Sequence, residues 1–486
     1  MPPCTRTTPK LELGYIKNIS HVPKNVIAKY LQSYAEPEAK EALACLAPLF
    51  KNSKLKNSNL KKNNFFAKHT ICLPCYAEDI DHLIRLLTFI GTQKNILTII
   101  VLNQPDSLDE GTCHSRQQQN QAWINYLKDK EKIQSKCIFE NQKFNLFNFN
   151  SNLILFIDRF SVEPIPLKQG VGLARKIGAD VALQLYDQNF IHSKWLHNTD
   201  ADIVIERNYF HSIEPVETEP FETQNAAAVV YPFKHIDDKK APVKLNSSDR
   251  IYAATALYEQ RLHQYVDGLR SAGSAYAYHT IGSCIALSLD HYAQVRGFPK
   301  QSAGEDFYLL NKLRKLGEVI SLDSPSVGIF ARESDRAPYG TGAAVNDILL
   351  HDNIEDAEIF YHPSTFIGLS IFIDWLKTLG ELEWNKILAE WKNELRTYAK
   401  LKLKSDTDPY LKSEAIVTAV ESIDFEQGLN HCVKQSKSKE AFDHQMLCWF
   451  DGFKTLKLVH GIRDECSLGA VKIKDLPRYS LEKENA

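Results

Sequence analysis

Short apolar runs alternate with helix-length segments from about residue 66 onward, and this alternation constrains the fold more than any other feature. "ILTIIVLN" and "NLILFIDRF" are continuous apolar runs, as expected for strands that are covered on both faces. "IDHLIRLLTFI" and "GVGLARKIGADVALQLY" have the pattern of helices. Strands alternating with helices of this length imply right-handed β-α-β units. We therefore expect an α/β fold with a mostly parallel sheet flanked by helices.

Two regions with a helical pattern flank this segment. The first, residues 1–64, ends in "KNSKLKNSNLKKNN", which lacks aromatic residues and is interpreted as a solvated linker rather than a nucleic-acid site. The second begins near residue 351, and its broad apolar stripe consists of Trp384, Ile387, Leu388, Trp391, Leu395 and Tyr398. That stripe fits either core packing or a face laid against the sheet. We expect a helical N-terminal extension at 1–64, an α/β domain at 65–350 and a helical C-terminal region at 351–486.

The composition argues against several classes of protein. With 44% hydrophobic and 24% charged residues the chain is typical of globular proteins, and its net charge of −2 gives no reason to expect a nucleic-acid partner. No apolar run approaches the ~20 residues of a membrane span. The first residues lack the apolar core of a secretory signal, and the ten cysteines show no framework spacing. We expect a cytoplasmic protein with free thiols, including buried ones at Cys72 and Cys75.

Two aspartates stand one residue apart in "WLHNTDADIVI", after a short apolar step. In an extended segment, side chains two apart point to the same face, so Asp200 and Asp202 can converge on one point. Their hard oxygens suit Mg²⁺ or Mn²⁺, and ligands of open α/β sheets collect outside the carboxyl ends of the strands. Taken alone, the pair is better explained as part of a turn.

A second acidic pair, Glu305 and Asp306, lies about 100 residues downstream in "GFPKQSAGEDFYLLNKLRKLGEVI". The two residues follow a glycine-bearing loop and open a segment with helical apolar spacing. Acidic residues in the first turn of a helix also favour its dipole. The dipole accounts for the two acids but not for the sequence around them.

Four segments resemble, in the same order, those of GT-A glycosyltransferases, most of all family 2. They are "CLPCYAEDIDHLIRLL", "GVGLARKIGADVAL", "HNTDADIVI" and "GFPKQSAGEDFYLLNKLRKLGEV". The resemblance covers roughly residues 68 to 345 and implies a Rossmann-like GT-A fold. It also implies a divalent metal, Mn²⁺ or Mg²⁺, and a UDP- or GDP-linked nucleotide-sugar donor.

The resemblance places the donor at the ends of the first two strands. Pro74, Tyr76 and Glu78 match the segment that holds the base and ribose in the family, with Ala77 in place of an asparagine. Asn103 stands where the family usually has an aspartate that contacts the base. These two departures leave the base open, with uridine as the default.

The resemblance also implies roles for the charged residues. Arg175 matches an arginine near the diphosphate, where it would add a charge-assisted hydrogen bond. Asp200 and Asp202 match the metal-diphosphate motif, and a metal there neutralises charge on the leaving phosphate. Asp306 matches the general base of inverting members, a role that contributes about 10²–10⁴-fold. Glu305 is expected to orient the acceptor or the base.

Other candidates depend on less specific patterns. Arg332 and Arg336 lie in "IFARESDRAPYGTGAAV", where they fit either contacts to a diphosphate or an anionic acceptor, or surface pairing with neighbouring acids. His279 and Gly282 precede an expected strand, at the place where family members form the acceptor pocket; a core or surface histidine is the simpler interpretation. His351 is a candidate third metal ligand, although no local motif selects it.

Together these observations predict a metal-dependent glycosyltransferase that moves a sugar to an acceptor hydroxyl, with inversion of configuration. One alternative is a retaining enzyme whose small anionic acceptor contacts Arg332 and Arg336. Another is a non-catalytic module that binds nucleotides or sugars. Nucleotidyl transfer is disfavoured because no glycine-rich basic loop follows the first strand. The sequence leaves the sugar, the acceptor and the oligomeric state open.

Overall fold

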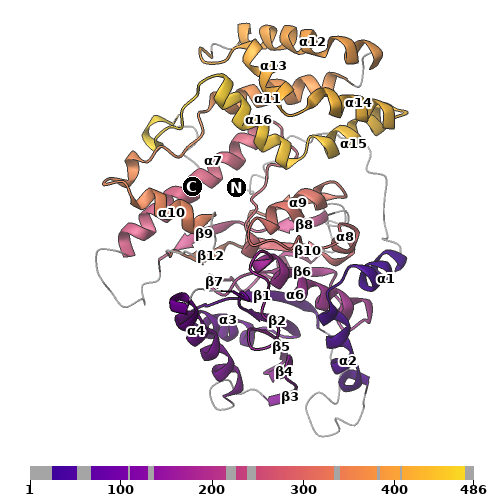
Figure 1. Cartoon of the computed structure of the whole chain (residues 1–486), viewed down its shortest axis with the longest axis vertical. Helices are drawn as coiled ribbons and strands as arrows, with labels where there is room; N and C mark the ends of the chain where they lie inside the picture. Colours follow the sequence, from indigo (N-terminus) through magenta and orange to yellow (C-terminus); the bar gives the residue numbers. More distant parts are fainter. Residues whose placement is uncertain are drawn as a thin grey trace, which may run out of the picture.

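The computed structural model describes residues 24–51, 67–107, 110–129, 136–214, 226–237, 248–332, 340–379, 384–405 and 408–476. Figure 1 shows a sheet with its covering helices in the lower part and a group of C-terminal helices above it. Among the described helices, none is long and apolar enough to cross a membrane.

The central sheet has nine strands within the described residues. In sheet order they are β11 (Glu318–Ser321), β8 (Ala226–Val230), β10 (Ile285–Ser288), β6 (Trp195–Asn198), β1 (His69–Cys75), β2 (Ile96–Asn103), β5 (Asn152–Arg159), β4 (Phe144–Phe149) and β3 (Lys136–Glu140). Strands β6, β1, β2 and β5 are parallel, whereas β10 is antiparallel to both of its neighbours. Strands β3 and β4 add an antiparallel extension. The predicted α/β class is therefore confirmed, with a mixed sheet.

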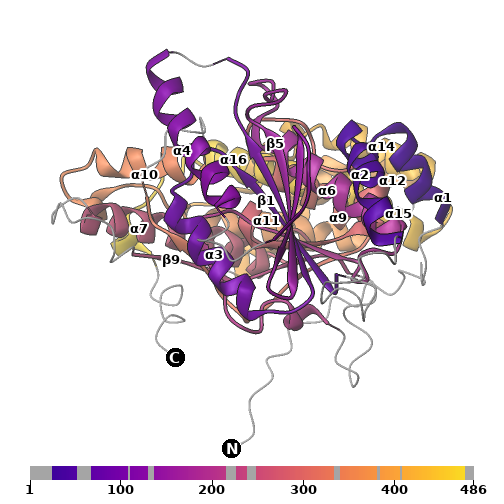
Figure 2. The same ribbon diagram turned by 90° about the horizontal axis from the view of Figure 1, so that it is seen from below.

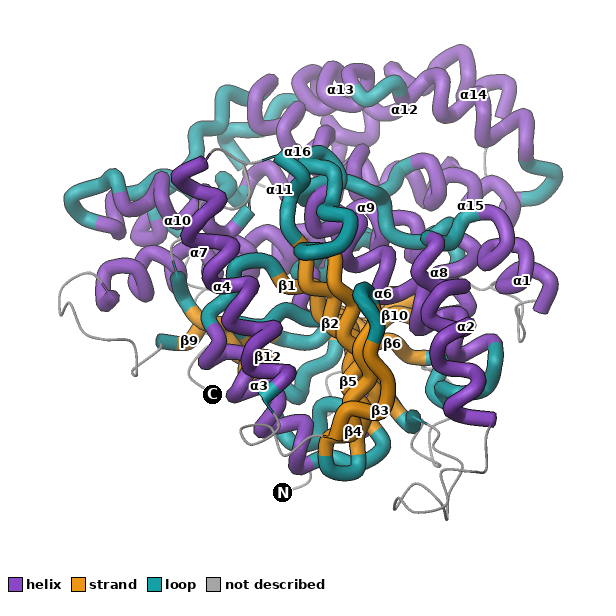
Figure 3. The backbone as a smooth tube through the Cα atoms, turned by 60° about the horizontal axis from the view of Figure 1, so that its bottom comes forward, coloured by secondary structure: helices purple, strands orange, loops and turns teal. Residues whose placement is uncertain are grey.

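Helices cover both faces of this sheet (Figures 2 and 3). One layer contains α3 (Ile80–Thr92) and α4 (Glu110–Lys128), and the other contains α6 (Gly170–Asp187), α8 (Leu289–Gln294) and α9 (Glu305–Arg314). Successive residues of β1 pack against the two helix layers alternately, because side chains alternate between the two faces along a strand. Ile71 and Leu73 pack on the α3 side, and Cys72 packs on the α6 side.

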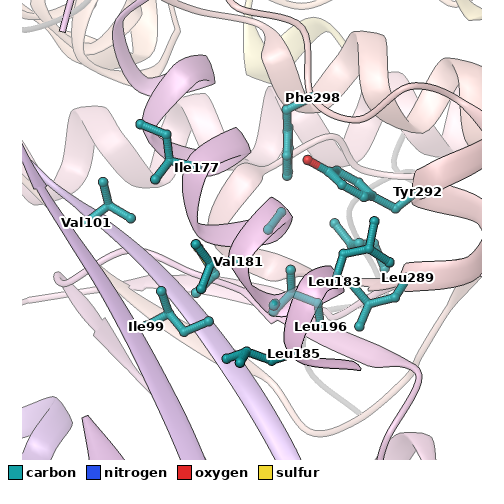
Figure 4. Close-up of a cluster of buried hydrophobic side chains, with 14 of the residues drawn as sticks. Ile99, Val101, Ile177, Val181, Leu183, Leu185, Leu196, Leu289, Tyr292 and Phe298 are labelled. Carbon is teal, nitrogen blue, oxygen red and sulfur yellow. The ribbon is translucent and has the colours of Figure 1, made fainter. Parts of the chain in front are cut away.

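The packing of α6 on the sheet is the part of the core that positions the site described below. In Figure 4, Ile177 and Val181 of α6 lie over Ile99 and Val101 of β2. Burying an aliphatic side chain of this size contributes roughly 1.5–3 kcal/mol. Several such contacts fix the distance of α6 from the sheet.

The flanking helices pack in two different ways. At the N-terminal end, α1 (Lys24–Ser33) and α2 (Pro37–Lys51) lie against α6 and α8 (Figure 1). At the C-terminal end, the apolar stripe predicted at 384–398 belongs to α12 (Trp384–Ser405), and it packs within the helical region rather than on the sheet. The other helices are α7 (Ser248–Ser271), α10 (Thr341–Leu349), α11 (Ser364–Thr378), α13 (Ser413–Ser422), α14 (Phe425–Gln435), α15 (Lys439–Trp449) and α16 (Gly452–Glu465).

A small second sheet extends from the site edge of the large one. Its strands are β7 (Ile203–Val204), β12 (Val327–Phe330) and β9 (Phe233–Ile236). Short 3₁₀ turns are η2 (His211–Ile213), η3 (Gly282–Cys284), η4 (Ile354–Asp356) and η6 (Ile473–Asp475).

Candidate functional site

Asp200 and Asp202 lie just beyond the carboxyl end of β6, at the edge where the parallel strands β1 and β2 also end. They occupy a bend between β6 and β7 rather than extended backbone. The bend is anchored because the Thr199 amide donates to the Cys72 carbonyl at 3.0 Å. Ala201 between the aspartates is fully buried. Local hydrogen bonding thus presents both carboxylates at one edge of the sheet.

Arg175, near the start of α6, connects the two acidic pairs. Its guanidinium is 3% exposed and donates from Nη2 to Oδ1 of Asp200 at 2.8 Å and from Nε to Oε1 of Glu305 at 2.8 Å. It also donates to the Thr199 carbonyl at 3.2 Å. The structure thus brings together residues from three segments that span 130 positions. A buried guanidinium needs such partners, because an unpaired buried charge is costly.

Arg332 forms a second bridge on the other side of the aspartates. Its Nε donates to Oδ2 of Asp202 at 2.7 Å, and its Nη2 lies 3.2 Å from Oε1 of Glu78. Burial, reinforced by the charge of Asp202, raises the pKa of Glu78 to about 8 despite the opposing charge of Arg332. The neighbouring residue Arg336 lies outside the described residues.

Asp306 lies in the first turn of α9, next to the buried Glu305. Burial, together with the charge of Glu305, raises the pKa of Asp306 to about 7. Its Oδ1 accepts a hydrogen bond from the Phe307 amide at 2.7 Å. A carboxyl group whose pKa lies near neutrality is suited to act as a general base.

The end of β1 differs in detail from the sequence interpretation. Pro74 belongs to β1 itself, and β6 pairs with β1 only as far as Cys72. Ala77 has a left-handed backbone with φ of 49°, and its amide donates to Oδ1 of Asn120 at 2.9 Å. The Asn103 side chain donates to the Cys75 carbonyl at 2.8 Å, so it links β1 and β2.

Two residues of α4 that the sequence interpretation missed therefore belong to this region. Asn120 fixes the turn at Ala77, and Arg116 donates to the Tyr76 hydroxyl at 2.8 Å. The Arg116 guanidinium also lies over the Tyr76 ring, 5.4 Å from its centroid. No spacing in the sequence relates α4 to the end of β1, and only the packed structure shows these pairs.

The expected acceptor side contains His279 and Gly282. Gly282 packs on Arg175, since a Cβ at position 282 would lie 2.5 Å from Nη2 of that arginine. His279 lies against the rings of Phe233 and His263, and burial lowers its pKa to about 3, so it is neutral at pH 7. His279 is thus a packed aromatic side chain beside the site.

A small cavity of about 90 Å³ is lined in part by Phe307, the residue that follows Asp306. It is formed where α7, the segment before η3, the start of α9 and the start of α16 meet, and its walls include Tyr265, Tyr276, Tyr278, His279, Phe307 and Gly452. Aromatic and aliphatic side chains both line it. The C-terminal helical region therefore contributes to the surroundings of the acidic residues.

His351 lies away from these contacts. It is exposed, follows α10, and its carbonyl oxygen accepts a hydrogen bond from Arg250 of α7. Nothing in its described surroundings places it with Asp200 and Asp202.

The site has the charge and the donor atoms that a divalent cation requires. Five carboxyl groups, those of Glu78, Asp200, Asp202, Glu305 and Asp306, surround two guanidinium groups. In the described structure the arginines engage Oδ1 of Asp200 and Oδ2 of Asp202, which leaves the second oxygen of each aspartate for another ligand. Carboxylate oxygens of this kind fit Mg²⁺ or Mn²⁺.

Comparisons of the sequence with protein-family models and with curated proteins give no match.

Proposed function

We propose that this chain is a metal-dependent glycosyltransferase with a GT-A fold, which transfers a sugar from a nucleotide-sugar donor to an acceptor hydroxyl group. The observation that carries the proposal is the Arg175 bridge, which joins Asp200 to Glu305 and so sets the acidic pair after β6 beside Asp306. Diphosphate departure and proton removal must occur close together in such a transfer, and this bridge joins residues suited to both.

On the donor side, Asp200 and Asp202 would hold the metal ion. That ion would supply Lewis-acid neutralisation of the leaving diphosphate. Arg332 is one-third exposed, so its guanidinium can turn from Asp202 toward a phosphate oxygen. Tyr76 and Glu78 at the end of β1 would contact the base and ribose. The Asn103 amide is engaged with the Cys75 carbonyl, which supports recognition of the base by other groups.

On the acceptor side, Asp306 would take the proton of the attacking hydroxyl, the arrangement of an inverting enzyme. Its pKa of about 7 favours proton uptake near neutrality. The cavity that Phe307, the residue after Asp306, lines together with three tyrosines supports an acceptor with an apolar or sugar-ring face, because such faces stack on aromatic side chains.

The test is a panel of nucleotide sugars incubated with the full chain and Mn²⁺, with donor consumption followed by chromatography. We expect one donor to be consumed, and Asp202→Ala to abolish its consumption. The matched control is Asp374→Ala, which removes a half-exposed aspartate that pairs with Lys377. Unchanged consumption by a folded Asp202→Ala protein would refute the metal assignment.

Two further outcomes distinguish the alternatives. NMR of the product anomer separates inversion from retention, and retention would remove Asp306 from the role of base. Binding of UDP or GDP with Mn²⁺, measured by titration calorimetry in the absence of any donor turnover, would identify a binding module instead of an enzyme.

A further inference from the structure

Two histidines and a glutamate gather at the opposite end of β1 from the acidic site. His69 opens β1, whereas Glu78 lies three residues beyond its last residue, Cys75, and a seven-residue strand spans roughly 20 Å. His211 begins η2 and Glu214 follows it. Among the described residues, these three form a group whose potential ligand atoms all lie within 4.8 Å of one another.

The spacing of these atoms is close to that of a metal site. His69 Nε2 lies 2.9 Å and His211 Nδ1 lies 3.4 Å from the same Glu214 oxygen, Oε1. Two ligands of a tetrahedral zinc ion, each at about 2.0–2.1 Å, lie roughly 3.3 Å apart. His211 is 57% exposed on its side chain, so it can adjust its ring while the buried His69 stays fixed.

His69 provides an independent sign that a ligand is needed. Its side chain is 4% exposed, and neither ring nitrogen has a hydrogen-bond partner of acceptable geometry. Its ring is enclosed by Phe210, His197 and His211. A poorly paired buried polar group is unfavourable, and a ligand at Nε2 would reduce that cost.

We propose that His69, His211 and Glu214 form a second metal site, which binds zinc or a similar divalent transition ion and leaves a fourth position to water. Two imidazoles and one carboxylate are a known zinc ligand set, whereas Mg²⁺ and Mn²⁺ prefer oxygen ligands. The site fastens the start of β1 to the turn at η2. It is separate from the aspartate pair and does not depend on the proposed glycosyltransferase activity.

Lys68 would compete with a metal ion for the Glu214 carboxylate. Its Nζ lies 2.6 Å from Oε1 of Glu214, and half of its side chain is exposed. An exposed ion pair of this kind contributes little to stability, so the lysine can move into solvent when a metal binds. Removing its charge strengthens the attraction between Glu214 and the ion.

The experiment is titration calorimetry of the metal-free full chain with Zn²⁺. We expect His211→Ala to weaken the tight binding event at least tenfold, Glu214→Gln to weaken it similarly, and Lys68→Gln to strengthen it. His431→Ala is the control, because it removes an exposed histidine in α14, outside the cluster. The two variants change side chains that are 57% and 34% exposed, which limits the risk of misfolding.

A second measurement separates this site from zinc bound by thiols. Zn²⁺ should raise the thermal unfolding midpoint of the wild-type and His431→Ala proteins and leave that of His211→Ala unchanged. Equal zinc affinity and equal thermal response in the wild-type and His211→Ala proteins would overturn the proposal. The glycosyltransferase proposal would be unaffected, since it is tested by Asp202→Ala.

Discussion

Replacing Gly282 by alanine should break the bridge that Arg175 forms between the two acidic pairs. The new methyl group would lie 2.5 Å from Nη2 of Arg175, closer than real Cβ contacts allow. The φ angle of Gly282 is outside the positive region, so alanine fits the backbone and the effect acts through the arginine alone. That nitrogen must move away, and Nη2 is the atom that donates to Asp200.

The size of the effect follows from the bond that is lost. A hydrogen bond to a charged group contributes about 1.5–3 kcal/mol, and Arg175 has no solvent to replace it because it is 3% exposed. We expect the free energy of unfolding to fall by about 1.5–3 kcal/mol. If the bridge positions Asp200 for the reaction, donor turnover should fall by about 10- to 150-fold, since 1.36 kcal/mol corresponds to a factor of ten.

Urea unfolding measures the free energy of unfolding, and Mn²⁺-dependent donor consumption measures donor turnover. Gly469→Ala is the matched control, because a methyl group there meets no atom within 4 Å. If the Gly282→Ala protein unfolds and turns over like the Gly469→Ala protein, Arg175 is not held tightly and the reasoning from its bridge is wrong. A loss of stability without loss of turnover would limit the bridge to a structural role.

Three further results are expected. Asp306→Asn should lower sugar transfer by about 10²–10⁴-fold while Mn²⁺-dependent binding of the nucleotide diphosphate, measured by calorimetry, stays within twofold of wild type. Because the base must be ionised and its pKa is raised to about 7, the pH profile of kcat/KM should fall about tenfold per unit below pH 7 and level off above it; a profile that is flat from pH 5 to 9 would contradict this role. Tyr30→Phe should lower the free energy of unfolding by about 1–3 kcal/mol in urea, because it leaves a buried Asp180 oxygen with one donor fewer, whereas Tyr34→Phe at an exposed position should not.

Strands and helices could be predicted from the sequence where their burial requires a regular pattern of apolar residues. The apolar runs at Ile96–Asn103 and Asn152–Arg159 are strands with both faces covered, as their composition indicates. The direction of a strand produces no such pattern. The sequence therefore could not show that β10 runs antiparallel to its neighbour β6. Helix α4 was also missed, because few of its residues are apolar and the buried ones near its end include Trp123 and Leu127.

The ion-pair partners of the arginines at the candidate site were harder to predict from the sequence than the fold. The sequence motifs select Arg175, Asp200 and Glu305, and the structure places the three in contact. Sequence reasoning could not show that Arg332 bridges Asp202 and Glu78, because these residues are 130 and 254 positions away from it. Pairing with its sequence neighbours was an equally good expectation. Such pairs are decided by tertiary packing, which has no local signature.

The position of the Arg175 guanidinium depends in turn on how closely α6 approaches the sheet. At Gly178 a Cβ would lie 2.2 Å from Sγ of Cys72, so only glycine permits the observed approach of α6 to β1.

On its other face, α6 is fixed by a buried polar network. Nζ of Lys176 donates to the Tyr30 hydroxyl at 2.6 Å and to Asp180 at 2.8 Å, and Asp180 also accepts from the hydroxyls of Tyr30 and Tyr292. Lys176 thus links α6 to the N-terminal helix that carries Tyr30. Because every member of the network is partnered, it favours one position of the helix. The N-terminal helices therefore hold the same helix that carries Arg175, on the face away from the sheet contact at Gly178.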